Sequence, residues 1–347
     1  MDQHSVIGLD LAKSVFQVHV ADASGKKLLS KKLKRAELMT WFAQQPVGKV
    51  GLEACGGAHE WARRLLALGF DVKMMAPQHV KPYVQGNKTD ARDAAAICEA
   101  ASRDSVPAVA IRDQNGQQMQ ALHRTRELWM KQRIATMNQI RGILLEFGEA
   151  LPVGHARFRQ AVCLWLAQET SPQLMVLHQL ISNLLAHWTA LDEQIAGLEC
   201  TIRQLHRANA ASLLIESIPG VGLLTATATI AAFGNCSQYG NARQFSCALG
   251  LTPREHSSGG KQLLLGISKR GNGYVRKLLI HGARAVIQAR TRQPAHAQDW
   301  EVQLAQRRGI NIAAVALASK NARRIWAMLQ SGELFHTVQP LAVPANS

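Results

Sequence analysis

The chain has 347 residues, of which 47% are hydrophobic and 18% charged, so it is long enough for two or three globular domains and too apolar for a disordered protein. Its 40 Lys and Arg against 24 Asp and Glu give a net charge of +16, which favours a polyanionic partner. Without a spanning-length apolar run, a signal-like N-terminus or a Cys-x-x-Cys pair among its six cysteines, the sequence predicts a cytoplasmic, nucleic-acid-binding protein with no membrane association.

Residues 1–104 predict an α/β domain with a mixed sheet. Stretches rich in Val and Ile predict strands at 5–10 and 15–22, KKLLSKKL at 26–33 can supply a third, and short apolar strands follow at 49–54 and 71–77. A helix is predicted around 60–68. Strands in a meander followed by strands that alternate with helices are typical of a mixed sheet. Thr89 can cap a helix that begins at Asp90, and residues 105–118 predict a boundary loop.

Residues 119–208 predict long helices. The first, 119–147, carries basic residues that we expect to contact nucleic acid: Arg124, Arg126, Lys131 and Arg133. In the second, apolar residues from Leu174 to Leu205 alternate spacings of three and four without a break. This seam is typical of a coiled coil, and it predicts either a hairpin packed on 119–147 or a dimerisation helix.

Residues 212–335 predict a helical C-terminal domain with a helix–hairpin–helix-like element. In Ile-Pro-Gly-Val-Gly, Gly220 and Gly222 would let a turn approach a phosphate, or would simply connect two helices. The tract 254–292 has nine Arg or Lys and one acid, a bias that favours phosphate contact over a solvated face. Its expected contacts are Lys261, Lys269, Arg270, Arg276 and Lys277.

Four acids stand out in this basic chain. Asp10 and Glu53 lie at the ends of predicted strands, and Asp90 and Asp93 share one face at a helix start. Like charges so close need a cation between them. Lys88 and Arg92 could supply it as a surface ion-pair cluster, or a divalent metal could, and carboxylates suit Mg²⁺ or Mn²⁺.

Four motifs in order, GLDLAK, LEACGGAHEW, NKTDARDA and IPGVG…GLTPREHSSGGK…GISKRGNGYVRKLLI, resemble the DEDD transposases of bacterial insertion sequences. These are Piv-like serine recombinases guided by a bridge RNA. The resemblance implies a RuvC-like, RNase H-like N-terminal domain whose metal-binding acids fall on Asp10, Glu53, Asp90 and Asp93. It also implies a nucleophilic serine, most naturally Ser258, although the adjacent Ser257 stays in play.

The resemblance implies a DNA transposase that cuts and rejoins strands through a phosphoserine intermediate. Donor and target DNA, a guide RNA and further copies of the chain, as a dimer or tetramer, would be its partners. Its active site would combine domains of different protomers, and it would act at the bacterial nucleoid. The alternative is a RuvC-like endonuclease, such as a junction resolvase, that uses water on the same four acids and leaves the C-terminal half without a role.

Overall fold

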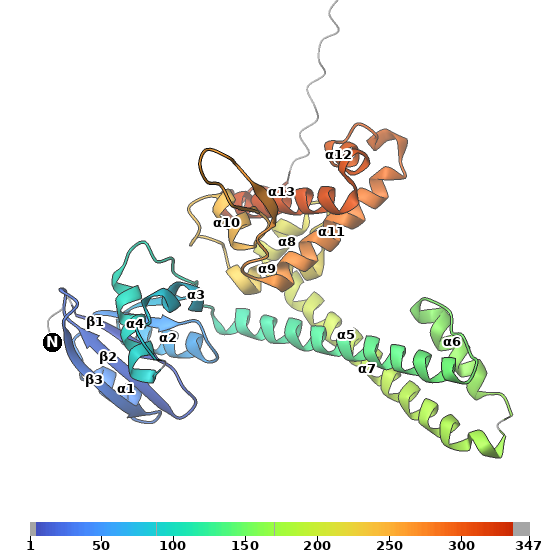
Figure 1. Cartoon of the computed structure of the whole chain (residues 1–347), viewed down its shortest axis with the longest axis horizontal. Helices are drawn as coiled ribbons and strands as arrows, with labels where there is room; N and C mark the ends of the chain where they lie inside the picture. Colours follow the sequence, from blue (N-terminus) through green and yellow to red (C-terminus); the bar gives the residue numbers. More distant parts are fainter. Residues whose placement is uncertain (1–4, 88, 170, 336–347) are drawn as a thin grey trace, which may run out of the picture. The chain divides into compact units, whose positions relative to one another are not determined.

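The structure is a computed structural model that describes residues 5–87, 89–169 and 171–335. It divides into two compact units: Met1–Gly116 with Cys236–Gly240, and Gln117–Asn235 with Asn241–Ser347 (Figure 1). The first unit is α/β and the second is largely helical, which confirms the predicted combination of a mixed α/β domain with long helices. Within the described ranges, no helix is long and apolar enough to cross a membrane.

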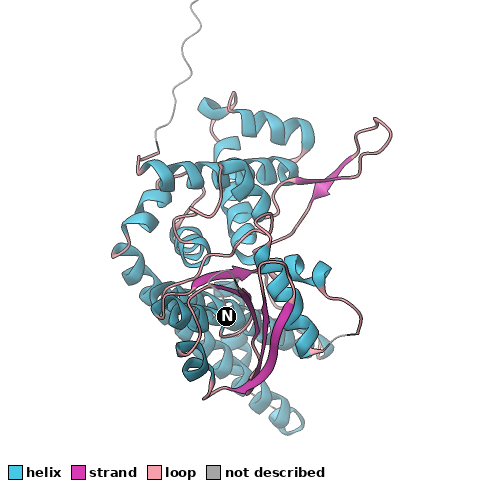
Figure 2. Ribbon diagram, turned by 90° about the vertical axis from the view of Figure 1, so that its left-hand side faces the viewer, coloured by secondary structure: helices cyan, strands magenta, loops and turns pink. Residues whose placement is uncertain are grey.

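The first unit is built on a five-stranded mixed sheet (Figure 2). Its strands are β1 (Val6–Asp10), β2 (Val15–Ala21), β3 (Lys27–Lys34), β4 (Lys49–Glu53) and β5 (Asp71–Met75), in the order β3-β2-β1-β4-β5. The β1–β2 and β2–β3 pairs are antiparallel, whereas β4 is parallel to both β1 and β5. All five strands lie where the sequence predicts them.

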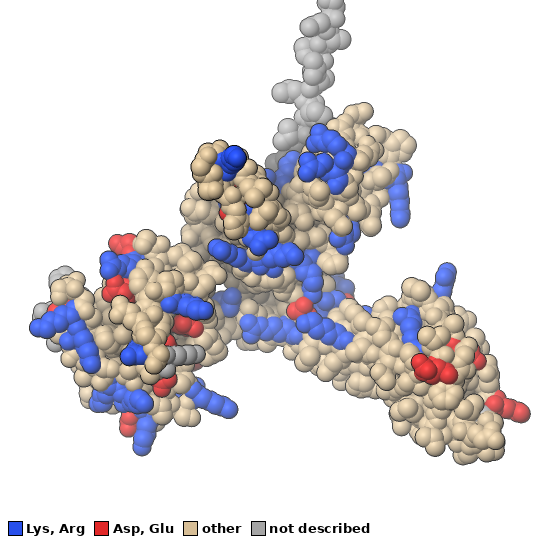
Figure 3. All heavy atoms as spheres, in the orientation of Figure 1, with Lys and Arg blue, Asp and Glu red and all other residues tan. Residues whose placement is uncertain are grey.

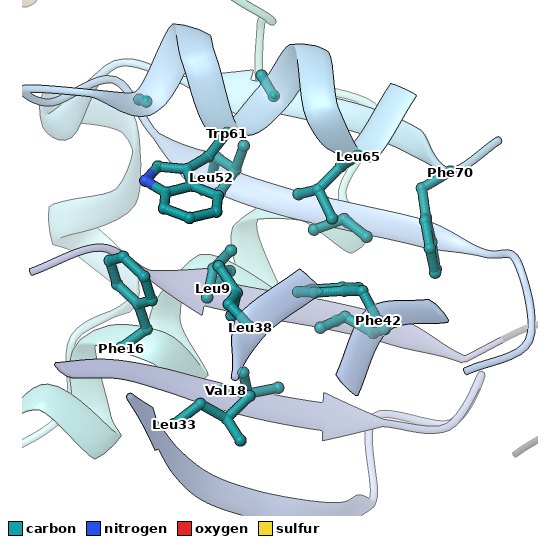
Figure 4. Close-up of a cluster of buried hydrophobic side chains, with 14 of the residues drawn as sticks. Leu9, Phe16, Val18, Leu33, Leu38, Phe42, Leu52, Trp61, Leu65 and Phe70 are labelled. Carbon is teal, nitrogen blue, oxygen red and sulfur yellow. The ribbon is translucent and has the colours of Figure 1, made fainter. Parts of the chain in front are cut away.

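One face of this sheet carries the main hydrophobic core (Figure 4). Helix α1 (Leu38–Ala43) and helix α2 (Ala58–Ala67) cover it. The rings of Phe16 and Trp61 meet edge to face with centroids 5.1 Å apart, a favourable aromatic geometry. Leu9 and Leu52 are fully buried beneath them. The sequence predicts α2 but not α1.

The opposite face is covered by helix α4 (Asp90–Ser102), which Thr89 caps by accepting a hydrogen bond from the backbone of Arg92. Two strand glycines let this helix come close. A Cβ on Gly8 would lie 2.2 Å from the Ala94 carbonyl oxygen, and one on Gly51 would lie 2.5 Å from Ala101 Cβ. The short α3 (Pro77–Val80) and η1 (Lys81–Tyr83) lead from β5 toward this helix.

The second unit begins with a helical hairpin. Its long helices are α5 (Gln114–Glu146) and α7 (Met175–Arg207), with α6 (His155–Leu166) and η2 (Pro172–Leu174) between them. Arg126 pairs with Glu199 and Arg133 pairs with Asp192. Since residue numbers rise along one helix as they fall along the other, α5 and α7 run antiparallel.

The apolar seam of α7 faces inward along this hairpin. Ile181, Trp188, Leu191, Ile195 and Ile202 are all buried. At the α6 end, seam residues share one cluster with Met137 and Ile140 of α5 and with Phe158 of α6. Of the two interpretations of the seam, the structure therefore shows the intramolecular hairpin.

The remainder of the second unit is helical apart from one β-hairpin. Its elements are α8 (Ala210–Glu216), α9 (Leu223–Phe233), α10 (Ala242–Ala248), β6 (Pro253–Glu255), β7 (Leu264–Ile267), α11 (Gly273–Thr291), η3 (Pro294–His296), α12 (Trp300–Arg308) and α13 (Ile310–Ser331). A buried network joins α5 to this part, because His123 hydrogen-bonds Tyr274 on α11 and Thr227 on α9, both at 3.0 Å.

Candidate functional site

Asp10 and Glu53 lie side by side at one edge of the sheet. Leu9 of β1 is in register with Leu52 of the parallel strand β4, so the next residues on the two strands are neighbours at their carboxyl ends. Side chains on a strand alternate between faces. Asp10 therefore projects from the same face as Gly8, and Glu53 from the same face as Gly51, which is the face that α4 covers.

Helix α4, which begins at Asp90, covers this same face. Ala94 and Cys98 both lie over Gly8 of β1, and the Cys98 thiol donates a hydrogen bond of 3.2 Å to the Val6 carbonyl. Asp90 is one helical turn, about 6 Å, before Ala94, and Asp10 is two residues, about 6.6 Å, beyond Gly8.

The electrostatics of neighbouring groups support this placement. Desolvation raises the pKa of the Cys55 thiol, and the negative charges of Glu53 and Asp10 raise it further. Both strand-end carboxylates thus lie near one thiol. On α4, the Arg92 guanidinium donates to the Asn87 carbonyl at 2.8 Å, and no described residue forms an ion pair with Asp90 or Asp93. Lys88, the other cation of the proposed ion-pair cluster, lies outside the described residues.

Asp10 and Glu53 are neighbours at the sheet edge, and Asp90 and Asp93 begin the helix on the same face, but the side chains do not converge into a finished metal site. Over residues 5–87, 89–169 and 171–335, no group of three or more His, Cys, Asp or Glu is placed to hold a metal ion. The four donors are nevertheless carboxylates, the ligand type that Mg²⁺ and Mn²⁺ prefer. The donor set fits such an ion.

The predicted nucleophile lies on the exposed β6–β7 hairpin, which projects from the helices in Figure 2. Ser258 and Lys261 form a backbone bridge around the turn residues Gly259 and Gly260, whose φ angles are +56° and +75°. A two-residue turn with two positive φ angles is a tight hairpin turn that glycine favours. The glycines thus expose the serines at the tip of a hairpin.

The two serines of this hairpin differ in their contacts. The Ser257 hydroxyl donates a hydrogen bond of 2.6 Å to Glu255 Oε1. The Ser258 hydroxyl makes no hydrogen bond within the described part of the chain, and it is exposed next to the two glycines. Ser258 is therefore the hydroxyl that is open to an incoming phosphodiester.

The predicted nucleic-acid contacts on α5 divide into paired and exposed cations. Arg126 and Arg133 form ion pairs with α7, and their side chains are only 15% and 14% exposed. This gives them a structural role in the helical hairpin. Arg124 and Lys131 are exposed on the same helix, so their phosphate contacts stay a prediction.

The basic tract 254–292 shows the same division. Arg276 donates to the carbonyls of Leu249 and Arg270, and Lys277 pairs with Glu127 at 2.6 Å. Lys261, Lys269 and Arg270 are exposed at the hairpin and its base. In Figure 3, Lys and Arg side chains gather around the hairpin and over α12 on the face shown.

The Ile-Pro-Gly-Val-Gly turn connects α8 to α9 as predicted, and its two glycines have different surroundings. Gly220, at φ +87°, lies against α11: a Cβ on Gly282 would come within 1.9 Å of the Gly220 carbonyl oxygen. Close packing explains Gly220. Around Gly222, by contrast, a Cβ would meet no described heavy atom within 4 Å, so a phosphate could approach there.

The hairpin that carries the serines is not predicted from the sequence. The residues Gln262 to Gly266 show no alternation of apolar and polar side chains, and the strands are exposed. One signal could have revealed it. Ser-Gly-Gly-Lys is a two-residue turn sequence of the kind that closes β-hairpins.

Comparison with known families gives two matches. Residues 212–298 match the family described as Transposase IS116/IS110/IS902 family, and residues 7–148 match a transposase family of the IS110 DEDD type. The second match covers β1, β4 and α4 with all four acids, and the first covers the serine hairpin.

Individual relatives are similar over nearly the whole chain. A probable family 20 transposase of Pseudomonas aeruginosa is 44% identical over 94% of this chain and 96% of its own. The transposase for insertion sequence element IS1111A of Coxiella burnetii is 42% identical over 96% and 92%. The transposase for insertion sequence element IS1328 of Yersinia enterocolitica is 36% identical over 96% and 99%.

Proposed function

Because this chain belongs to the IS116/IS110/IS902 family of insertion-sequence transposases, which cut and rejoin DNA, we propose that it does so with a serine nucleophile and a carboxylate-bound divalent metal. The pairing of Asp10 with Glu53 at one sheet edge, on the face covered by the helix that begins with Asp90 and Asp93, carries this proposal. The first unit then takes the part of an RNase H-like, RuvC-like domain. Its five-stranded mixed sheet is compatible with that assignment.

In this proposal Asp10, Glu53, Asp90 and Asp93 hold Mg²⁺ or Mn²⁺. The ion, when bound, would polarise a phosphate oxygen and neutralise charge that develops at phosphorus. The remainder of the chemistry falls to the chain. The two strand-end acids stand on paired strands of the sheet, and the capped first turn of α4 presents the other two.

The nucleophile in this proposal is Ser258. Its Oγ forms a bond to phosphorus while one P–O bond of the phosphodiester breaks, and the hydroxyl proton ends on the departing sugar oxygen. The resulting phosphoserine keeps the strand attached. A sugar hydroxyl of another strand then attacks the phosphorus, displaces Ser258 and restores a phosphodiester, so rejoining needs no further energy source.

The partners in this proposal are donor and target DNA, a guide RNA and other copies of the chain. The exposed cations Arg124, Lys131, Lys261, Lys269 and Arg270 are where we place the sugar–phosphate backbones. Since the α7 seam is filled within the chain, a dimer or tetramer would be held by other surfaces. Action at the nucleoid follows from the DNA substrate.

The test is a denaturing gel of protein incubated with DNA that contains the element's ends and Mg²⁺. We expect a protein–DNA adduct that resists denaturation and is absent from Ser258→Ala. If DNA is cleaved without any adduct, and a variant that lacks both Ser257 and Ser258 still cleaves it, then water is the group that attacks the phosphodiester. The chain would then act as a metal-dependent endonuclease on the same four acids.

A further inference from the structure

A cavity of about 540 Å³ lies at the base of the serine hairpin, within the second unit. Pro253 and Ile267, which pair as the first and last residues of the hairpin's two strands, form one wall. The opposite wall is α13, through Val315 and Ala316. This volume falls in the range of small-molecule sites, about 300–1,000 Å³.

The cavity combines one aromatic face with two cations. Trp300, the first residue of α12, lines it with 38% of its surface exposed. The Lys320 ammonium lies 4.6 Å from the Trp300 ring centroid, and Arg323 stands one turn further along α13. An aromatic face beside cations suits a ligand that is both flat and anionic.

The acids of this region are already engaged. Glu301 is buried and pairs with Arg290, which also pairs with Asp299 at 3.0 Å. No acid in the described ranges forms an ion pair with Lys320 or Arg323. Desolvation lowers the pKa of Lys320, and the charge of Arg324 lowers it further, so this ammonium gains from an anionic partner. The mouth is therefore electropositive.

We propose that this cavity binds one unpaired nucleotide of the DNA strand under attack, with its base stacked on Trp300 and its phosphate on Lys320 and Arg323. A base within a duplex is stacked on both faces and cannot enter, so the site selects a nucleotide that has left the helix. The inference rests on the proposed function, since it takes the DNA at the hairpin as the substrate.

The geometry also places that nucleotide relative to the nucleophile. Five residues separate Pro253 from Ser258, which span at most about 17 Å of extended chain. That is the length of about five base steps along one DNA strand. The cavity thus holds a nucleotide within about five steps of the attacked phosphate and would keep a melted strand end from moving away.

The first test is photo-crosslinking in Ser258→Ala protein with chelator present, so that the outcome does not depend on cleavage. The probe is a single-stranded DNA of about 12 nucleotides that carries 5-iodouracil. We expect the cross-link to map to the peptide that contains Trp300. Cross-links only elsewhere would overturn the proposal, as would preferential cross-linking here by an RNA of the same sequence, which would assign the cavity to RNA.

The second test measures affinity at one salt concentration. Trp300→Ala should weaken single-strand binding at least about fivefold, while the matching duplex changes less than about twofold. Trp300→Phe should restore single-strand binding, and Arg308→Met, at the far end of α12, serves as the charge control for Lys320→Met. Equal losses for single strand and duplex, or no loss, would overturn the stacking role. If no serine adduct forms but Trp300→Ala still weakens single-strand binding selectively, the serine mechanism is rejected and the proposal for the cavity stands.

Discussion

The Ser257 hydroxyl is bound to Glu255 two residues earlier, whereas Ser258 projects from the turn without such a partner. That hydrogen bond holds the Ser257 hydroxyl against Glu255, whereas the Ser258 hydroxyl is free to turn toward a phosphodiester. This difference separates two serines that are adjacent in the sequence.

We expect Ser258→Ala to abolish the covalent adduct and strand exchange while DNA binding persists. Ser257→Ala should keep at least about a tenth of the activity, because it removes only a local hydrogen bond of about 1 kcal/mol. Denaturing gels and a gel-shift assay measure both properties. A dead Ser257→Ala beside an active Ser258→Ala would move the nucleophile by one residue.

Asp10→Asn and Glu53→Gln should each lower strand cleavage at least about a hundredfold, because a bound metal supplies several kcal/mol to the transition state. Both should also weaken Mn²⁺ binding in calorimetric titration. The control is Glu99→Gln on α4, an acid that pairs with Arg103 and lies more than two helical turns after Asp90. Unchanged Mn²⁺ binding in a folded Asp10→Asn would remove that residue from the site.

His123 predicts a pH dependence of stability. Burial lowers its pKa from 6.5 to about 4, with a further contribution from the charge of Arg126. Between these values the unfolded chain binds more protons, so the free energy of unfolding should fall by about 3 kcal/mol as pH drops from 6.5 to 4. Urea unfolding of the unsubstituted protein and of His123→Gln at several pH values measures the contribution of His123 to this fall. The same dependence of the unfolding free energy on pH in both proteins would contradict the prediction.

Neutralising Lys261, Lys269 and Arg270 should weaken DNA binding and flatten its dependence on salt. Each lost contact with a duplex phosphate lowers the log–log slope by about 0.9, so the triple variant should lose up to about 2.7. Fluorescence anisotropy over a salt series provides the slopes. Arg64→Gln, which removes a cation already paired with Glu60, should leave the slope unchanged. An unaltered slope in the triple variant would mean that these three cations face solvent and do not contact phosphates.

Gly282→Ala should destabilise the second unit by about 1–3 kcal/mol, because the new methyl would lie 1.9 Å from the Gly220 carbonyl oxygen. Gly197→Ala on α7 is the matched change, since a Cβ there meets no described heavy atom within 4 Å. It should stabilise by about 0.5–1 kcal/mol. Thermal unfolding distinguishes the two. Equal changes in stability for the two variants would mean that the turn at Gly220 shifts at little energetic cost.

Local patterns were sufficient to predict the strands. Four of them, β1, β2, β4 and β5, are short runs with Val among other apolar residues, whereas β3 is rich in Lys. Thr89 is a capping residue directly before Asp90, where α4 begins. Local patterns also predict that Asp10 and Glu53 end strands. That the two strands are parallel neighbours, and that Gly8 and Gly51 admit α4 onto the same face, depends on packing between distant segments.

The helical seam shows a different limit. Apolar periodicity states that a helix has a buried stripe, but not which helix covers it. The ion pair between Arg126 and Glu199 identifies α5 as the helix that covers the stripe of α7. Because these two residues are 73 positions apart, no periodicity in the sequence indicates that they pair. The same pairing explains two arginines that the sequence assigned to nucleic acid, since basic residues on a helix look alike before their partners are known.

The two ion pairs of the helical hairpin also set its unit of length. From Arg126 to Arg133 is seven residues, and from Asp192 to Glu199 is seven residues, so both helices repeat in step. One heptad adds about 10.5 Å. An insertion of one residue would rotate everything beyond it by about 100° and expose the apolar stripe. The helical hairpin can therefore be lengthened without exposing its apolar stripe only by inserting seven residues in α5 together with seven in α7.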